Sequence, residues 1–139
     1  MSAYLNENHP DTAYHCGRLM AVLSELQRTA LPGVDAGIVQ RYYAAASSTP
    51  ALVLGRLIKT SQFHLNKLGG GLAYIYERKI ADICSAIKDA IPVTLTLEQQ
   101  SLFALGYYQQ LAKDRGDRAD KAAAKRDALN NSQEDNYNE

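Results

Sequence analysis

The side chains most often used for metal binding or nucleophilic chemistry are few in this sequence of 139 residues, which holds three histidines and two cysteines. None of the histidines forms a His-x-x-x-His or Glu-x-x-His pair, the kinds of pair that place two metal ligands on the same helical face. His9 and His15 are predicted to lie on different sides of a helix, and His64 stands alone. Cys16 and Cys84 fall on apolar helical positions and form no Cys-x-x-Cys pair, so we expect two buried free thiols.

Other catalytic signatures are also missing. The glycine triplet at 69–71 follows no predicted strand and precedes no Lys-Ser/Thr pair, which indicates a tight loop rather than a phosphate-binding loop. No Gly-x-Ser-x-Gly sequence is present, and the carboxylates are scattered among basic neighbours. We therefore predict a protein that is not an enzyme and that holds no metal and no cofactor.

Helix start and stop signals indicate which elements position these residues. Pro10 and Pro50 suit the first turn of a helix, and Asp35 suits an N-cap. Thr96 and Gln99 match the capping box, in which each side chain bonds the other residue's backbone amide. No period-two strand pattern occurs, so we predict an all-α fold, a compact bundle of about five helices. The expected ranges are 9–30, 35–48, 49–68, 72–91 and a last helix that begins at 96.

The first helix is predicted to be amphipathic, because its apolar residues recur at spacings of three and four along one side. These residues are Cys16, Leu19, Leu23, Leu26 and Ala30. Three charged residues take the opposite side, namely Arg18, Glu25 and Arg28. Small residues on the side away from the expected core would let another helix approach closely, and they are Gly17, Ala21 and Ser24.

The last helix is apolar on more than one side, as expected for a helix that is central in a bundle or pressed against a partner. Its first stripe is Leu102, Leu105, Tyr108 and Ala112, and its second stripe is Phe103, Tyr107 and Leu111. From Lys113 onward the sequence is polar, with six basic and seven acidic residues. We predict an N-terminal arm at 1–8, a helical bundle at 9–112 and a polar tail at 113–139 that is helical at first and then disordered.

Net charge does not indicate a nucleic-acid-binding protein, because 15 basic residues balance 15 acidic ones. The sequence has no apolar run long enough to span a bilayer, and its polar N-terminus lacks the apolar centre of a signal peptide. We expect a cytoplasmic protein that has no membrane partner.

The balanced total hides a local excess of positive charge. Between Ile38 and Lys79, six basic residues stand against the single acid Glu77, a net charge of +5. On the helix expected at 49–68, basic residues and an aromatic ring gather opposite the apolar side, a surface that can neutralise phosphates and stack on bases. The candidate nucleic-acid-binding residues are Arg41, Arg56, Lys59, Phe63, His64, Lys67 and Lys79. The alternative is an ordinary solvated face, with Phe63 at a protein interface.

Three stretches resemble, in order and spacing, the C-terminal region of the large subunit of type I-C CRISPR complexes. They are Gly17-Arg18-Leu19-Met20-Ala21-Val22-Leu23 with Leu26-Gln27, Arg41-Tyr42-Tyr43 through Thr49-Pro50-Ala51 to His64-Leu65-Asn66-Lys67-Leu68, and Leu97-Glu98-Gln99-Gln100 with Phe103-Ala104-Leu105-Gly106-Tyr107-Tyr108-Gln109-Gln110. The resemblance covers about residues 13–111. The sequence departs from the family at Gln100, where a glycine is usual, and at Gln109, where a histidine is frequent.

The resemblance implies a small subunit of the type I-C surveillance complex, Cascade, made separately from the large subunit by internal translation. Proteins of this kind are helical bundles that stack along the complex in more than one copy. The implied partners are the Cascade backbone subunits, the Cascade large subunit, neighbouring copies of itself, guide RNA and target DNA. Base pairing supplies sequence specificity in such systems, and the protein contributes backbone contacts that hold the paired and displaced strands.

Two other functions stay open. In the first, the chain is a structural spacer that contacts only protein subunits, and Tyr42, Phe63 and the second stripe of the last helix are interface residues. In the second, it is an independent helix-turn-helix regulator. This reading is weaker because the helix after the loop at 31–35 carries only Arg41 as a candidate to read bases.

Overall fold

The computed structural model describes residues 4–33 and 37–137. Five helices and no strand make up this part of the chain, which confirms the predicted all-α fold. In chain order they are α1 (Thr12–Ala30), α2 (Ile38–Ser48), α3 (Pro50–Leu68), α4 (Gly70–Ala86) and α5 (Leu97–Tyr137). Asp35, the expected N-cap of the second helix, lies outside the described residues.

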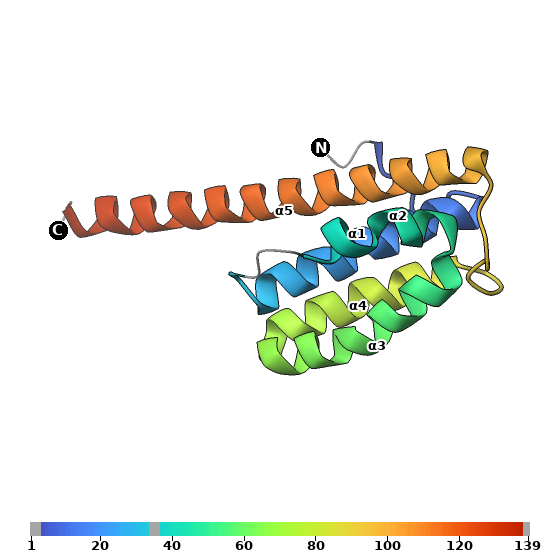
Figure 1. Cartoon of the computed structure of the whole chain (residues 1–139). Helices are drawn as coiled ribbons and strands as arrows, with labels where there is room; N and C mark the ends of the chain where they lie inside the picture. Colours follow the sequence, from blue (N-terminus) through green and yellow to red (C-terminus); the bar gives the residue numbers. More distant parts are fainter. Residues whose placement is uncertain (1–3, 34–36, 138–139) are drawn as a thin grey trace.

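The helices pack in layers around α1. The long α5 lies along one side, α1 and α2 lie beneath it, and α3 and α4 form the opposite side (Figure 1). α1 contacts each of the other four helices, and α5 is its most extensive partner. The core sits on both sides of α1, which therefore occupies the centre of the bundle.

The central place of α1 corrects the prediction that this helix is amphipathic. Its residues from Ala13 to Leu26 are all buried, including Arg18 and Glu25, which were expected to face solvent. The polar side is covered because α5 packs on it. A side chain at Gly17 would collide with the backbone of Phe103 on α5, so the predicted close approach of another helix is confirmed at this glycine.

Burying Arg18 is tolerated because two of its guanidinium nitrogens form hydrogen bonds to buried side chains. Its Nε donates to Gln110 Oε1 at 2.9 Å, and its Nη1 donates to His15 Nδ1 at 2.9 Å. Gln110 Nε2 in turn donates to Asp114 Oδ1 at 3.0 Å, and Lys79 Nζ from α4 reaches the same oxygen at 3.2 Å. This network links α1, α4 and α5 through side chains.

Glu25 makes a second polar link between α1 and α5. Its side chain is 5% exposed and forms ion pairs with Arg28 at 3.5 Å, Arg115 at 3.8 Å and Arg118 at 3.1 Å. Arg115 and Arg118 belong to the region predicted to be a solvated tail. Ion pairs, rather than apolar packing, thus attach the first turns of the polar part of α5 to the core.

α5 is longer than expected, since it continues as one helix to Tyr137 and passes beyond the rest of the bundle (Figure 1). The sequence between Lys113 and Leu129 contains no proline, is rich in alanine, and includes a Lys113–Asp117 ion pair of 3.0 Å one turn apart. These features favour helix propagation once the helix has started against α1. The division into arm, bundle and tail stays a prediction.

The remaining helix ends follow local signals with several shifts. α4 begins at Gly70, so Gly70 and Gly71 lie in its first turn and not in the tight loop expected at 69–71. α1 begins at Thr12, because the Asp11 side chain accepts from Ala13 N at 2.8 Å, and not at His9 as expected. The predicted capping box is confirmed, with Thr96 N donating to Gln99 Oε1 at 2.9 Å and Gln99 N donating to Thr96 Oγ1 at 3.1 Å. α4 ends at Ala86, before the proline that was expected to close it.

The early end of α4 has a tertiary cause. The segment that follows α4 places Ile87 and Leu95 in the core. Its backbone bonds the junction of α2 and α3, where Leu95 N donates to Ser48 O at 2.9 Å and Ala51 N donates to Pro92 O at 3.0 Å. These contacts replace the helical hydrogen bonds that the segment gives up.

Candidate nucleic-acid interface

The candidate site lies between α2 and α3, which meet at a sharp corner. Pro50 is the first residue of α3, and it disfavours helical geometry at Thr49, which adopts φ −131° and ψ 68°. The two helices therefore diverge from Thr49 (Figure 1). The space between them is a groove of about 560 Å³ that is lined by both helices and by Gln27 at the end of α1.

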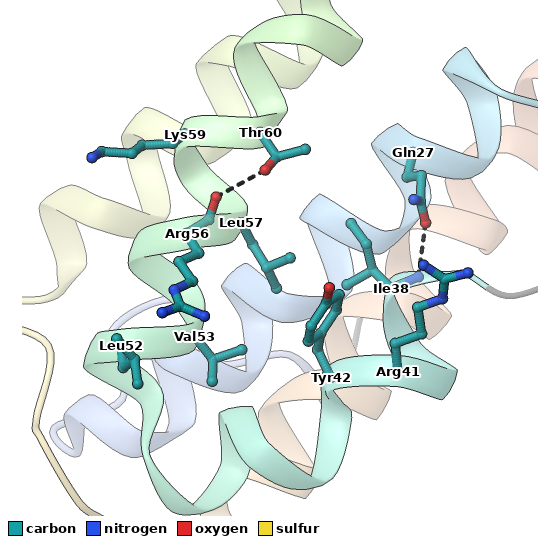
Figure 2. Close-up of a pocket in the computed structure, with 10 residues that line it drawn as sticks. All are labelled: Gln27, Ile38, Arg41, Tyr42, Leu52, Val53, Arg56, Leu57, Lys59 and Thr60. Atoms are coloured by element: carbon teal, nitrogen blue, oxygen red, sulfur yellow. Dashed lines mark hydrogen bonds between the residues drawn. The ribbon is translucent and has the colours of Figure 1, made fainter.

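The floor of this groove is apolar. Ile38 and Tyr42 from α2 point toward Val53 and Leu57 from α3 (Figure 2). Ile38, Val53 and Leu57 are buried, whereas Tyr42 is 41% exposed and Leu52, on α3, is 60% exposed. The groove thus offers one exposed aromatic ring above a closed hydrophobic base.

Cationic side chains flank this floor. Arg41 on α2 and Arg56 on α3 both line the groove and are exposed, while Lys59 lines it from α3 and extends away from α2 (Figure 2). No acidic residue lines the groove, and none of these three cations forms an ion pair with any residue that the structure describes. The site is therefore electropositive and open to an anionic ligand.

The cationic character continues along the outer side of α3. Phe63 and Lys67 follow Lys59 at intervals of four residues, which places them on the same side of the helix, and both are exposed. The Phe63 side chain is 60% exposed. Five of the seven candidate residues are exposed around the groove or on this side of α3, and we call these five the basic face. It consists of Arg41, Arg56, Lys59, Phe63 and Lys67.

The other two candidate residues lie elsewhere. His64 is 3% exposed, because it lies on the inner side of α3, and its Nδ1 has no hydrogen-bond partner. Burial lowers the pKa of His64 below the usual 6.5, so it is neutral at neutral pH. Lys79, on α4, forms an ion pair of 3.2 Å with the buried carboxylate of Asp114 on α5, so it is not a free cation of the groove.

Two further pairs of opposite charges have helical spacings that favour an ion pair, namely Glu25 with Arg28 and Arg78 with Asp82. The Glu25–Arg28 pair is present at 3.5 Å. Among the residues that the structure describes, Arg78 and Asp82 do not form the ion pair that their spacing predicts.

Sequence reasoning missed the polar members of the groove. Gln27 Oε1 accepts from Ile38 N at 2.7 Å, which caps the start of α2, and Thr60 Oγ1 donates to Arg56 O at 3.0 Å (Figure 2). Neither residue stands out in the sequence, because each becomes part of the groove only through the angle between the helices. The one available signal was Arg41-Tyr42, a cation next to an aromatic ring at the start of a helix.

The two cysteines and the potential metal ligands that the structure describes lie outside the groove. Burial raises the pKa of the Cys16 thiol to about 12, and burial also raises the pKa of Cys84, so both remain protonated at neutral pH. Cys16 is fully buried, as predicted, and Cys84 is only partly so. Within residues 4–33 and 37–137 there is no group of three or more His, Cys, Asp and Glu side chains placed to hold a metal ion.

The fold and this site define a helical protein with an electropositive groove. A family model described as "CRISPR-associated protein (Cas_Csd1)" matches residues 1–114, which include the whole of the groove and most of the bundle. The chain belongs to this family of type I-C CRISPR-associated proteins. A comparison with curated proteins finds no match.

No helix in the part of the chain described by the structure has the length and apolarity to cross a membrane.

Gln100 and Gln109, where the sequence was expected to depart from the family that it resembles, both form side-chain hydrogen bonds. Gln109 Oε1 accepts from the Tyr14 hydroxyl of α1, which ties α5 to the first turn of α1. Gln100 Nε2 donates to Leu95 O at 3.2 Å and so fastens the segment that precedes α5. Both substitutions are compatible with the bundle.

Proposed function

We propose that the chain is a non-catalytic small subunit of a type I-C surveillance complex, Cascade, and that it contacts the nucleic-acid backbone through its basic face. In this role it lies along the complex beside the backbone and large subunits. It supports guide RNA–target DNA pairing and holds the displaced strand through contacts that do not depend on sequence.

The observation that carries this proposal is the grouping of unpaired cations. Arg41, Arg56 and Lys59 surround one acid-free groove, although the whole chain has as many acidic as basic residues. Ordinary solvated helices intersperse the two signs, and the chain does so on α5, where Lys113 pairs with Asp117. Concentration of one sign favours an anionic partner.

Charge reversal on α3 tests the proposal in the assembled complex. The triple variant Arg56→Glu, Lys59→Glu, Lys67→Glu is expected to bind target DNA more weakly than the wild type. Its affinity should also depend less steeply on salt, because each lost phosphate contact reduces the slope of log K against log salt by about one. Affinity is measured by gel shift or fluorescence anisotropy over a salt series.

A matched control separates a local effect from a change of net charge. Lys121, Lys125 and Arg126 are exposed on α5, outside the basic face, and their replacement by Glu changes the net charge equally. We expect this control to retain target capture and the wild-type salt slope. Wild-type capture by the α3 variant would reject the basic face as a nucleic-acid contact.

The structural spacer remains the second candidate, and the outer side of α5 favours it. Leu105 and Tyr108 are 46% and 62% exposed there, and Leu97 at the start of the helix is 83% exposed. Leu105 and Tyr108 belong to the first stripe of the helix. Phe103, Tyr107 and Leu111 of the second stripe are buried inside the bundle, so they are not the interface residues expected for a spacer.

Cross-linking decides between the two candidates. The assembled complex is irradiated with target DNA that carries photoreactive groups along both strands. Adducts on peptides containing α2 or α3 support the nucleic-acid role. If the large and backbone subunits form adducts and this chain forms none, the spacer is correct.

A further inference from the structure

We propose that the groove between α2 and α3 holds an unstacked base, so that the basic face binds single-stranded nucleic acid in preference to a duplex. This inference rests on the proposed function and adds a base-binding subsite to it. The argument begins from the shape of the groove, because contact with phosphates alone does not require a concave apolar surface.

The groove has the size and polarity of a small-ligand site. Its volume of about 560 Å³ lies within the range of roughly 300–1,000 Å³ that such sites occupy, and its floor is hydrophobic. A duplex keeps its bases stacked inside and presents sugars and phosphates to a protein. Only a strand with splayed bases can place an apolar ring system in this groove.

Tyr42 is the residue placed to stack on such a base. Its ring stands at the groove between Ile38 and the α3 wall, and it is 41% exposed (Figure 2). Stacking on an aromatic ring tolerates any base, because every base has a π-face. The subsite therefore remains compatible with a protein whose contacts do not select sequence.

Two polar groups at the groove retain hydrogen-bonding capacity toward a base edge. The Gln27 carbonyl oxygen is occupied by Ile38 N, which leaves its amide nitrogen as a donor. The Thr60 hydroxyl donates to Arg56 O, which leaves its oxygen lone pairs as acceptors. With one donor and one acceptor, the groove can satisfy a base edge without demanding a particular base.

The flanking charges favour a nucleotide over an apolar side chain from a protein partner. Arg41 on one wall and Arg56 on the other can contact the phosphates on either side of an inserted base. A protein segment would need an apolar residue between two acidic residues to match this arrangement. A nucleic-acid strand provides that alternation of ring and negative charge at every position.

The wild-type chain and three oligonucleotide ligands test the inference without any mutation. The ligands are a mixed-sequence single strand, the same strand with abasic sites, and the corresponding duplex. We expect the intact strand to bind about 5- to 150-fold more tightly than the abasic strand, the range expected for loss of one stacked base. The duplex should bind more weakly than the intact strand at the same salt concentration.

Substitution at Tyr42 provides the second measurement. Tyr42→Ala should reduce single-strand affinity by a similar factor and leave affinity for the abasic strand unchanged, whereas Tyr42→Phe keeps the ring and should bind like the wild type. A 2-aminopurine base in the strand should lose fluorescence on binding to the wild type and not on binding to Tyr42→Ala. Circular dichroism verifies that each variant is folded.

The outcomes separate the two proposals. Equal affinity for intact and abasic strands, with binding that still weakens upon charge reversal in α3, overturns base insertion and leaves the proposed function intact. Absence of binding to every oligonucleotide, in the isolated chain and in the assembled complex at low salt, overturns both. Displacement of the strand by a peptide of alternating acidic and apolar residues, without a difference between intact and abasic strands, would assign the groove to a protein partner.

Discussion

Gly17 of α1 and Gly106 of α5 each lie against the backbone of the opposite helix, and neither position has room for a side chain. A Cβ atom at Gly17 would collide with the Phe103 carbonyl, and one at Gly106 would collide with the Tyr14 carbonyl. The two glycines set the distance between the helices that bury most of the core. Because the atoms in the way belong to the backbone, they cannot move aside as a flexible side chain does.

We predict that Gly17→Ala and Gly106→Ala each lower the free energy of unfolding by about 1–3 kcal/mol or more, since the helices must move apart. Urea denaturation followed by circular dichroism measures the change. Gly55→Ala on α3 is the control: a Cβ there meets no atom within 4 Å, and alanine is expected to stabilise the helix by about 0.5–1 kcal/mol. If Gly17→Ala and Gly106→Ala were both as stable as the wild type, this packing would be contradicted.

The ion pairs around Glu25 predict a local effect on α5. Glu25→Gln removes the carboxylate that Arg28, Arg115 and Arg118 share, and should cost about 1–3 kcal/mol, because a buried charged acceptor is lost. Backbone amides after Arg115 should exchange with deuterium faster, while those of α3 should not. Asp117→Asn, which breaks an exposed pair with Lys113, should change stability by less than about 0.5 kcal/mol.

Uniform protection from exchange along α5 in Glu25→Gln would show that the polar part of this helix does not depend on the carboxylate.

His64 predicts a pH dependence of stability. Burial lowers the pKa of His64 in the folded protein below the usual 6.5, so the unfolded state takes up a proton first as the pH falls. The stability due to the neutral form is complete above about pH 6.5 and is lost as the pH falls from there through the folded pKa. His15 contributes with the same sign, because burial, the largest cause, also lowers its pKa.

His64→Leu tests this linkage. The variant should be as stable as the wild type or more stable at neutral pH, since leucine removes the unpartnered Nδ1 atom. Its free energy of unfolding should fall less than that of the wild type between about pH 7.5 and pH 5. Denaturation at both pH values measures the difference. Identical losses in the two proteins would mean that His64 does not change protonation state on unfolding.

The hydrogen bond from Ile38 N to Gln27 Oε1 predicts that α1 stabilises the start of α2 beside the groove. Gln27→Ala removes the acceptor of the Ile38 amide at the start of α2 and should cost about 0.5–2 kcal/mol, as for loss of a helix cap. The Ile38 amide should exchange faster in the variant. Gln62→Ala, at an exposed position on α3, should leave both stability and this exchange rate close to those of the wild type. An unchanged Ile38 exchange rate in Gln27→Ala would contradict the cap.

The parts of the fold that depend on local signals were predictable from the sequence. The capping box at Thr96 and Gln99, the break at Pro50 and the close helix approach at Gly17 each follow from a few neighbouring residues, and the structure confirms them. The end of α4 was not predictable in this way. It depends on hydrogen bonds to a corner formed by residues far away in the sequence.

The central position of α1 was hidden for a similar reason. Arg18 and Glu25 indicate an exposed side, and only their partners Gln110, Arg115 and Arg118, about 90 residues away, make their burial possible. The candidate site likewise has one part that the sequence predicted and one part that it did not. Helical periodicity placed Arg56, Lys59 and Lys67 on an exposed face, while the groove that joins them to Arg41 arises from the angle between two helices.

The pairing of the first helix with the last has a consequence for how the chain folds as it is synthesised. α1 leaves the ribosome early, yet the surface that covers its polar side belongs to α5, whose contacts with it span about 90 residues. Such distant contacts slow folding, because a long loop must close before they form. Until α5 is made, Arg18 and Glu25 of α1 lack their α5 partners Gln110, Arg115 and Arg118, and the apolar residues beside them are not yet covered. α1 therefore stays partly uncovered until α5 is made, and anything that stalls translation before residue 97 leaves this central helix open to aggregation.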